Sequence, residues 1–227
     1  MPPPGGQTRR VRILVTAGPT REPIDPVRFL TNRSSGKMGY ALAHAFQHAG
    51  HSVLLVSGPT DLDVPDHVDF IPVETAADMC DAVRHSIGRM DIAVFAAAVA
   101  DYTVRDPAPE KIKKSSDPLT LELVKTTDIL GSAREPFGFE GTLVGFAAET
   151  NDLEANARDK LTRKRCDLII ANDVSKPGIG FDSDRNEVLL VYPTHNEQVP
   201  ETTKHDLAHR LAHAILTLHA ERVGCEP

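Results

Sequence analysis

The chain has 227 residues, of which 41% are hydrophobic and 25% charged, and its formal net charge is -7. This length and composition suit one α/β domain with an ordinary core. The negative charge, without interleaved basic and aromatic residues, argues against a nucleic-acid or membrane-surface protein, so any anion site must be local. The three cysteines form no CxxC pair, which favours a reducing compartment, and we expect a cytoplasmic protein. No apolar run approaches the roughly 20 residues of a membrane span.

The regular elements alternate along the chain. Residues 1–10 are rich in Pro and Gly and then basic, and we expect a flexible leader before a single domain from 11 to 227. Periodicity and turn residues predict strands at 11–16, 53–56, 68–73, 92–98, 119–124, 142–146, 167–171 and 187–192, and helices at 35–49, 75–87, 153–165 and 204–223. Alternation of this kind predicts right-handed βαβ units, an α/β fold and a mainly parallel sheet.

One connection is unusually long and basic. Tyr102 to Pro118 is polar and rich in Pro and Lys, which favours a functional flap over a passive linker. Its stretch Glu110 to Lys114 carries three lysines, which could close over a polyphosphate. A solvated charge run is the other interpretation.

A glycine turn after the first strand leads to a possible anion site. Gly18 follows that strand, and the segment from Asn32 to Gly39 (NRSSGKMG) opens a helix whose free N–H groups attract anions. An ordinary N-cap with helix-packing glycines is the alternative. A P-loop is excluded, because Thr31 stands where its first Gly belongs and Met38 replaces its Ser/Thr. A dinucleotide fingerprint is also absent.

Two further patterns suit a nucleotide but are weak alone. Asp101 follows the alanine-rich strand end where ligands of open α/β sheets bind, although it could simply form a turn. Lys160 and Lys164 share one helix face, as a triphosphate site would require. Such a like-charged pair is also tolerated in solvent.

The histidines raise the question of a metal. His44 and His48 have ligand spacing but lack the Glu of HExxH, and His205, His209 and His213 repeat every four residues. A zinc site needs three or four converging ligands and usually supporting groups around them. A polar face on a terminal helix is therefore the favoured interpretation.

Several segments in order resemble one family. They are Thr16–Thr20, Thr31–Gly39, Ala97–Tyr102, Pro109–Lys114, Gly145–Thr150 and Ala171–Val174. Together they resemble phosphopantothenoylcysteine synthetase, the synthetase half of the bacterial bifunctional coenzyme A biosynthesis protein, over roughly residues 11–223. The resemblance implies a Rossmann-like three-layer fold and a homodimer.

The resemblance also implies the site residues. Those for phosphopantothenate are Gly18, Asn32, Ser34, Gly36, Gly39, Ala97 and Ala98. Those for the nucleotide are Asp101, Lys111, Thr127, Asp128, Ile129, Leu130, Phe146, Lys160 and Lys164. Asn32 and Lys111 are the expected catalytic residues: Asn32 would orient the acyl intermediate, and Lys111 would close with the flap. Metal ligands are not identified.

The implied reaction is a ligation. 4'-Phosphopantothenate would be activated by CTP to an acyl-cytidylate with loss of pyrophosphate, and cysteine would then form an amide and release CMP. CTP and Mg²⁺ are implied, and no flavin is expected in this chain, although many bacteria fuse this unit to a flavin-dependent decarboxylase. No cysteine of the chain is expected to be catalytic, because the thiol-bearing molecule that reacts is the substrate cysteine.

Fold alone leaves two alternatives. An NAD(P)-dependent oxidoreductase lacks support because GxGxxG and an acidic ribose residue are absent. A non-catalytic nucleotide-binding regulator would not need both the lysine flap and Asn32.

Overall fold

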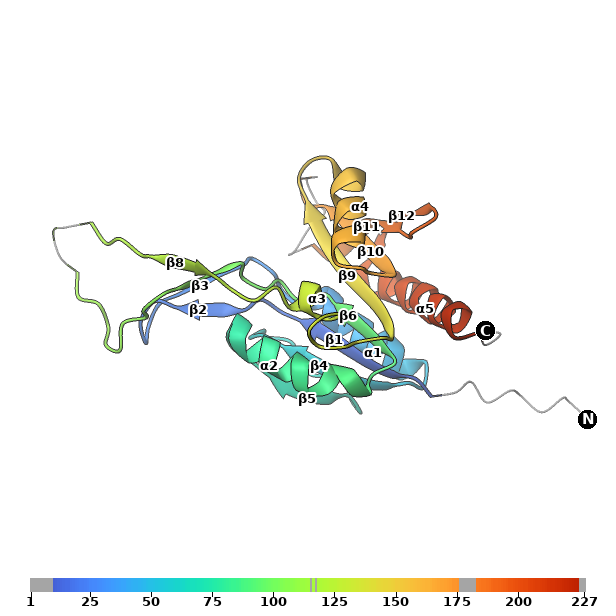
Figure 1. Cartoon of the computed structure of the whole chain (residues 1–227), viewed down its shortest axis with the longest axis horizontal. Helices are drawn as coiled ribbons and strands as arrows, with labels where there is room; N and C mark the ends of the chain where they lie inside the picture. Colours follow the sequence, from blue (N-terminus) through green and yellow to red (C-terminus); the bar gives the residue numbers. More distant parts are fainter. Residues whose placement is uncertain (1–9, 115, 117, 176–182, 225–227) are drawn as a thin grey trace, which may run out of the picture.

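The computed structural model describes residues 10–114, 116, 118–175 and 183–224, and the expected leader therefore lies almost wholly outside the described residues. Within this part of the chain the main sheet has eight strands in the order β12-β11-β10-β9-β6-β1-β4-β5 (Figure 1). Their bounds are β1 Arg12–Ala17, β4 Ser52–Ser57, β5 Asp69–Pro72, β6 Ile92–Phe95, β9 Thr142–Glu149, β10 Leu168–Asp173, β11 Arg185–Val191 and β12 Asn196–Thr203.

In the main sheet, β5, β4, β1, β6, β9 and β10 pair in parallel, and β11 and β12 add an antiparallel edge. The central strands are buried on both faces, as continuous apolar runs predict. The predicted α/β fold with a mainly parallel sheet is confirmed.

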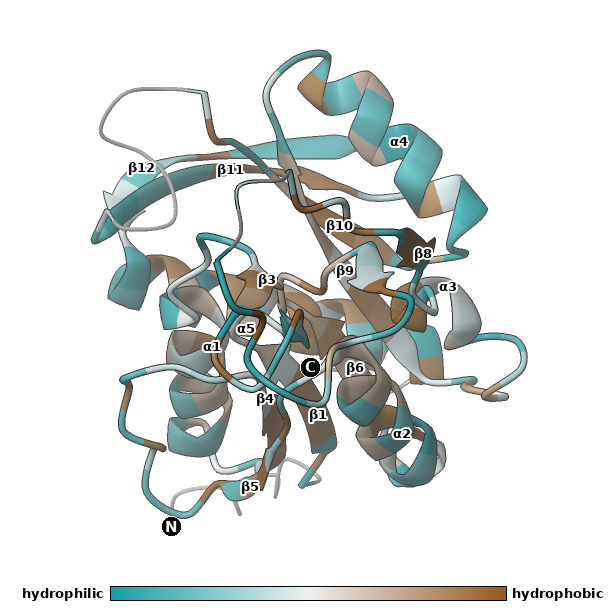
Figure 2. Ribbon diagram, turned by 90° about the vertical axis from the view of Figure 1, so that its left-hand side faces the viewer, coloured by the Kyte–Doolittle hydropathy of each residue, from teal (hydrophilic) through white to brown (hydrophobic). Residues whose placement is uncertain are grey.

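Helices cover both faces of the sheet and complete three layers. Helices α1 (Lys37–His48) and α5 (Lys204–Val223) share one core cluster with the strands, and α2 (Ala76–Ser86), α3 (Ile129–Ser132) and α4 (Leu153–Arg163) share the other. Figure 2 shows α1 and α5 on one side of the strands and α2 and α3 on the other. A short 3-10 turn, Ile87–Arg89, follows α2. None of these helices is long and apolar enough to cross a membrane.

Two small hairpins extend from the carboxyl ends of the parallel strands. The first pairs β2 (Arg21–Pro23) with β3 (Phe29–Thr31), and the second pairs β7 (Tyr102–Val104) with β8 (Leu123–Lys125). Figure 1 shows both reaching away from the sheet, on the side opposite the two termini. We call the described residues of 21–31 and 102–125 the arm.

The arm corrects two predictions. The flap begins as a strand, because Tyr102–Val104 pairs with the residues that return from its tip. The strand predicted at 119–124 is misplaced: only Leu123–Lys125 forms a ladder, since β7 offers three partners, although the main-chain N–H of Arg105 still donates to Glu122 at 2.9 Å.

A buried carboxylate ties the two halves of the arm together. Asp25 accepts hydrogen bonds from the main chain of Val27 and Arg28, from the Arg28 guanidinium and from the main-chain N–H of Ile112 at 3.1 Å. Arg28 also donates to the Ile112 carbonyl at 2.6 Å. Burial alone would raise the pKa of Asp25, but these hydrogen bonds outweigh it and hold the pKa well below its usual range. The base of the flap is therefore anchored at Ile112.

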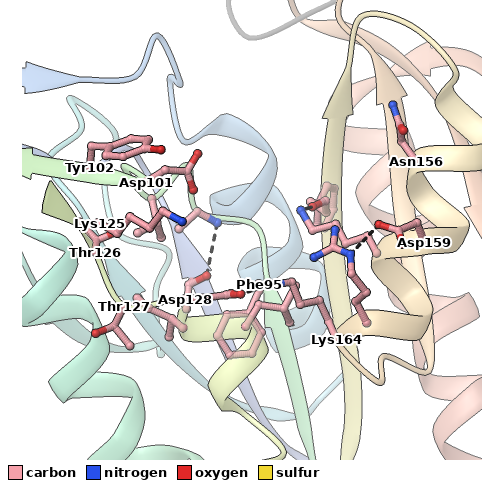
Figure 3. Close-up of a pocket in the computed structure, with 18 of the residues that line it drawn as sticks. Phe95, Asp101, Tyr102, Lys125, Thr126, Thr127, Asp128, Asn156, Asp159 and Lys164 are labelled. Atoms are coloured by element: carbon pink, nitrogen blue, oxygen red, sulfur yellow. Dashed lines mark hydrogen bonds and ion pairs between the residues drawn. The ribbon is translucent and has the colours of Figure 1, made fainter. Parts of the chain in front are cut away.

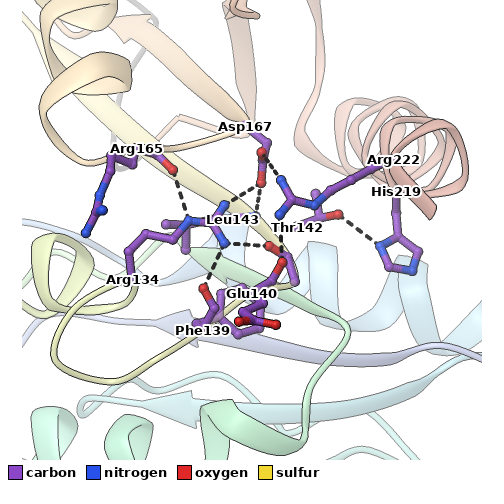
Figure 4. Close-up of polar contacts among 10 residues, drawn as sticks. Arg134, Phe139, Glu140, Thr142, Leu143, Arg165, Asp167, His219 and Arg222 are labelled. Carbon is purple, nitrogen blue, oxygen red and sulfur yellow. Dashed lines mark hydrogen bonds and ion pairs between the residues drawn. The ribbon is translucent and has the colours of Figure 1, made fainter.

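A second polar network joins β10 to its neighbours (Figure 4). The carboxylate of Asp167 forms ion pairs with Arg134, at 2.8 Å, and with Arg222 of α5. It also accepts a hydrogen bond from the main-chain N–H of Leu143 at 2.7 Å. Arg134 also donates to three carbonyls, those of Phe139, Gly141 and Arg165. One carboxylate and two guanidinium groups thus connect β9, β10, α5 and the loop after α3.

Candidate functional site

Helix α1 begins without a side-chain cap. Gly36 is its N-cap residue, with a φ of 76°, and no side chain accepts a hydrogen bond from the first turn in the capping position. The first turn also contains no acidic residue. Its N–H groups and its positive dipole end therefore face the preceding loop, which is the arrangement that binds phosphate at helix N-termini.

Glycines allow this loop to pack closely against β1. A Cβ added to Gly36 would lie 3.3 Å from the Cα of Gly18, and one added to Gly39 would lie 2.5 Å from the Cβ of Ala17. Gly18 itself has a φ of 69°, a region that favours glycine. The glycines therefore serve helix packing as well as an open approach to the helix start.

Asn32 lies where the ends of β1 and β6 meet. Its Nδ2 donates to the carbonyl of Ala98 at 2.9 Å, and the N–H of Ala98 donates to the carbonyl of Gly18 at 2.9 Å. The N–H of Gly36 is 3.4 Å from the Ser34 hydroxyl. The structure thus brings together the residues predicted for phosphopantothenate at one place, the carboxyl ends of the strands beside the start of α1.

A cleft of about 710 Å³ adjoins this place. Its walls come from the arm and α3 on one side and from β9 and α4 on the other (Figure 3). Thr16 and Ala97 line it, and the N–H of Ala97 donates to Thr16 Oγ1 at 3.3 Å. Thr16 lies two residues before Gly18, and Ala97 lies directly before Ala98. The cleft therefore reaches the same strand ends as the residues predicted for phosphopantothenate.

Most predicted nucleotide residues line this cleft. They are Asp101, Thr127, Asp128, Ile129, Leu130, Phe146, Lys160 and Lys164. They come from four separate segments, so their convergence is a property of the fold and not of local sequence.

Lys160 is a largely buried cation of the cleft. Its Nζ donates to the Phe146 carbonyl at 2.7 Å. Burial lowers the pKa of Lys160, and the nearby charge of Lys164 lowers it further, while Glu149 and Asp128 act in the opposite direction. An anion that enters the cleft would meet a positive charge that water screens poorly.

Lys164 pairs across the cleft. It ends α4 as the C-cap residue, where the helix dipole favours a cation, and it forms an ion pair with Asp128, the N-cap residue of α3 (Figure 3). Burial alone would raise the pKa of Asp128, but the bonds from Lys164 and the Gly131 N–H lower it. A triphosphate in the cleft would compete with Asp128 for this ammonium group.

Lys111 is the one predicted nucleotide residue that does not line the cleft. It is exposed on the arm, next to Ile112 and its anchor at Asp25. Its expected role therefore requires movement of this segment.

The structure adds polar cleft residues that the sequence did not single out. They are Lys125, Thr126, Asn156, Asp159 and Arg163. Arg163 and Lys164 lie three and four residues after Lys160, so helical spacing could have indicated Arg163. Lys125 lies two residues before the predicted stretch 127–130, but its position depends on the β7–β8 ladder.

The cysteines and the third histidine of the predicted stripe lie elsewhere. Burial raises the pKa of the Cys166 thiol to about 12 and also raises that of Cys80, so thiolate is scarce at both near neutral pH. Cys225 lies outside the described residues. His213 lines a separate cavity beside Tyr192 and His195 and does not join the other histidines of α5.

Comparison with known proteins shows the family of this chain. Residues 8–218 match the family described as DNA/pantothenate metabolism flavoprotein C-terminal domain. The "Coenzyme A biosynthesis bifunctional protein CoaBC" of Vibrio vulnificus is 48% identical over 208 residues, which are 91% of this chain and 52% of that protein. The chain spans about half the length of the curated relatives it matches.

Two solved structures extend the comparison. The C-terminal domain of a CoaBC protein is 40% identical, with a TM-score of 0.79, over 93% of this chain and 98% of that one. A Cab2 mutant in complex with phosphopantothenate-cysteine has a TM-score of 0.75 at 18% identity, over 94% of this chain and 88% of that one, and it supports the fold alone. The chain therefore belongs to the DNA/pantothenate metabolism flavoprotein C-terminal domain family and corresponds to the C-terminal domain of the CoaBC proteins.

Proposed function

We propose that this chain is a phosphopantothenate–cysteine ligase of coenzyme A biosynthesis. The observation that carries the proposal is the joining of two anion sites at the same strand ends. One is the uncapped start of α1, beside Asn32 and Ala98, and the other is the cleft that holds Lys160 and Lys164. A reaction between a phosphorylated acid and a nucleoside triphosphate requires two such sites side by side. The fold shared with Cab2, whose solved structure holds phosphopantothenate-cysteine, is consistent with this substrate class.

The first step activates the acid. A carboxylate oxygen of 4'-phosphopantothenate attacks the α-phosphorus of CTP, a new P–O bond forms, and the bond to the β-phosphate breaks to release pyrophosphate. Negative charge grows on the leaving phosphates as that bond breaks. The ammonium groups of Lys160 and Lys164 would stabilise this charge, because preorganised cations in a cleft that excludes water act strongly on a transition state.

The second step forms the amide. The amine of cysteine attacks the acyl carbon, the C–N bond forms, the C–O bond to the cytidylate breaks, and CMP leaves as the nitrogen loses a proton to solvent. Asn32 Nδ2 donates to the Ala98 carbonyl at the end of β6. The other hydrogen of the same amide would donate to the acyl oxygen and orient the intermediate for aminolysis.

Magnesium would bind together with the nucleotide. Mg²⁺ usually uses one or two carboxylates and the substrate's phosphates. Of the cleft carboxylates, Asp128 pairs with Lys164, Asp159 pairs with Arg163, and Glu149 accepts a hydrogen bond from Asn156 at 3.1 Å, while Asp101 is exposed at the cleft. Asp101 would therefore hold the ion, which would neutralise charge on the triphosphate. CTP is preferred over ATP in the proposal because the ordered motifs follow the bacterial pattern.

Lys111 would act after closure of the arm. The segment is anchored at Ile112 but carries Lys111, Lys113 and Lys114 as exposed side chains. Closure would bring Lys111 to the triphosphate and would exclude water. Water would otherwise hydrolyse the acyl-cytidylate before cysteine reacts with it.

The wider setting is also part of the proposal. The bifunctional relatives suggest that the unit is joined in nature to a flavin-dependent decarboxylase, with the flavin in that other half. We propose a homodimer in the cytoplasm with small-molecule substrates and no nucleic-acid or membrane partner.

The test is pyrophosphate release by the purified chain with Mg²⁺ and 4'-phosphopantothenate, comparing CTP with ATP, with and without cysteine. The proposal requires release that depends on phosphopantothenate, followed by CMP and the cysteine adduct when cysteine is present. Release with ATP alone would keep the ligase and overturn the preference for CTP. No release with either nucleotide would contradict the ligase and favour a nucleotide-binding regulator.

A further inference from the structure

Four histidines converge from α1 and α5, the two helices that cover the side of the sheet opposite α2, α3 and α4. His44 and His48 lie on α1, and His205 and His209 lie on α5. Their rings contact one another as a group, with centroid separations of 4.7 Å for His205–His209, 6.0 Å for His44–His48 and 6.1 Å for His48–His209. None of the four lines the nucleotide cleft.

Three of these rings already have the arrangement of a ligand set. One ring nitrogen from each of His44, His205 and His209 lies within 4.8 Å of the other two. A tetrahedral ion with metal–nitrogen bonds of about 2.1 Å separates its ligand atoms by roughly 3.4 Å. His44 and His205 are exposed and His209 is half-buried, so side-chain rotation can bring the nitrogens closer without moving either helix.

The backbone that carries the rings is held by apolar packing. Leu42 and Phe46 of α1 and Leu207 and Leu211 of α5 are fully buried in the same core cluster. Each helix presents its two histidines at i and i+4, a spacing that places both rings on one face. The core therefore fixes the distance between the two pairs, and each pair is complete on its own helix.

A carboxylate beside the cluster favours the binding of a cation. Asp206 Oδ1 lies 3.6 Å from Nδ1 of His205. A carboxylate beside a metal-binding imidazole commonly orients the ring for coordination. Imidazole donors select zinc, copper and nickel over magnesium and calcium, which prefer oxygen ligands.

We propose that His44, His205 and His209 form a binding site for a divalent transition metal such as Zn²⁺, with His48 as the fourth ligand, joining α1 to α5. This site is separate from the one that would hold Mg²⁺ with the nucleotide. The N-cap residue of α1 is Gly36, so a metal that holds the later turns of α1 would also restrain its start, where the proposed function places the phosphate.

Zinc binding to the chain without any histidine tag tests the proposal. The protein is stripped with a chelator, dialysed, and titrated with zinc chloride by calorimetry. The expected result is one zinc per chain with a Kd of about 1 μM or tighter, together with a rise in Tm. Cobalt chloride should give the visible absorption bands of tetrahedral nitrogen coordination.

Single variants identify the ligands. His44→Ala and His209→Ala should each weaken zinc affinity on the order of tenfold or more. His213→Ala is the matched control. His213 also lies on α5 but lines a different cavity, so this variant should leave the zinc affinity unchanged. Exposed His205→Gln provides a further ligand variant if one of the others lowers stability without metal.

Two results would overturn the proposal. The first is a zinc Kd weaker than about 1 mM. The second is tight binding that His44→Ala and His209→Ala leave unchanged, or that His213→Ala weakens as much as they do. Neither result bears on the ligase, because nucleotide turnover is not measured.

Discussion

Lys160 is the residue on which the nucleotide assignment depends most. Most of its side chain is buried, and it faces the cleft with its Nζ on a main-chain carbonyl rather than on a carboxylate. Among the described residues no carboxylate forms an ion pair with Lys160. A buried ammonium group without such a partner costs stability, and the lowered pKa reports that cost. A bound triphosphate would supply the missing charge.

Replacing Lys160 with Gln should therefore separate activity from stability. We expect pyrophosphate release to fall on the order of 10²-fold, as for the loss of one preorganised electrostatic group, while Tm stays the same or rises. Arg84→Gln is the control, because Arg84 pairs with Asp81 on the exposed face of α2. Activity of the Lys160 variant equal to that of the control would remove Lys160 from the site.

Asp25 gives the arm a stability that depends on pH. Its pKa is lower in the folded protein than the unfolded value of about 3.9, so its ionised form stabilises the fold above that pH. This contribution is lost as the pH falls from about 4 toward the folded-state pKa. Asp25→Asn should lower the urea midpoint at pH 7, and the difference from the unsubstituted protein should shrink at pH 3.

The control for Asp25 is Asp61→Asn, which changes an exposed carboxylate in another loop. It should leave the midpoint unchanged at both values of pH. A difference between Asp25→Asn and the original chain that stays constant from pH 7 to pH 3 would show that Asp25 does not titrate with folding.

At the scale of elements, the contact between α1 and β1 determines the position of the start of α1, where we propose that phosphopantothenate binds. A Cβ on Gly39 would meet Ala17 at 2.5 Å from Cβ and 3.1 Å from Cα, so Gly39→Ala must push the first turn of α1 away from the sheet. Overpacking of this kind costs about 1–3 kcal/mol. We expect weaker phosphopantothenate binding by calorimetry and a lower Tm.

Gly88→Ala is the matched control for Gly39. It adds the same methyl group where no other atom lies within 4 Å. If Gly39→Ala bound phosphopantothenate as well as Gly88→Ala does, the start of α1 would not be the substrate site.

The Asp167 network joins elements at the other end of the sheet. Asp167→Asn removes the charge that receives Arg134 and Arg222, both within hydrogen-bond distance. Loss of charged hydrogen bonds at a largely buried site costs about 1.5–3 kcal/mol, which chemical denaturation would measure. Asp81→Asn breaks an exposed pair and should cost at most about 1 kcal/mol. Equal costs would assign the network no special stabilising role.

The elements also show where sequence analysis works and where it stops. The central strands and the larger helices were predictable because each buries a continuous or periodic apolar set, as in β6 and α5. The hairpins β2–β3 and β7–β8 were not, since their strands have three residues each and depend on pairing partners. Strand β12 was missed because only Val199 of its eight residues is buried.

At the scale of the whole molecule, the site is the meeting of distant segments. The predicted nucleotide residues converge without any local signal that could place Thr127 opposite Lys164. Asp101 and the lysine pair were visible in the sequence as weak patterns, and helical spacing from Lys160 could have added Arg163. Lys125 became a site residue only through the fold. The position of Lys111 outside the cleft could not be predicted either, because it depends on the anchoring of Ile112 by Asp25.

The central claim is that two substrates meet at the carboxyl ends of β1 and β6. A crystal structure of the protein with 4'-phosphopantothenate and CTP tests this most directly. The account predicts the triphosphate within hydrogen-bond distance of Lys160 Nζ and Lys164 Nζ, and the phosphopantothenate phosphate at the main-chain N–H groups that begin α1. A nucleotide bound in the cavity beside Tyr192 and His195, or a cleft left empty at saturating CTP, would contradict it.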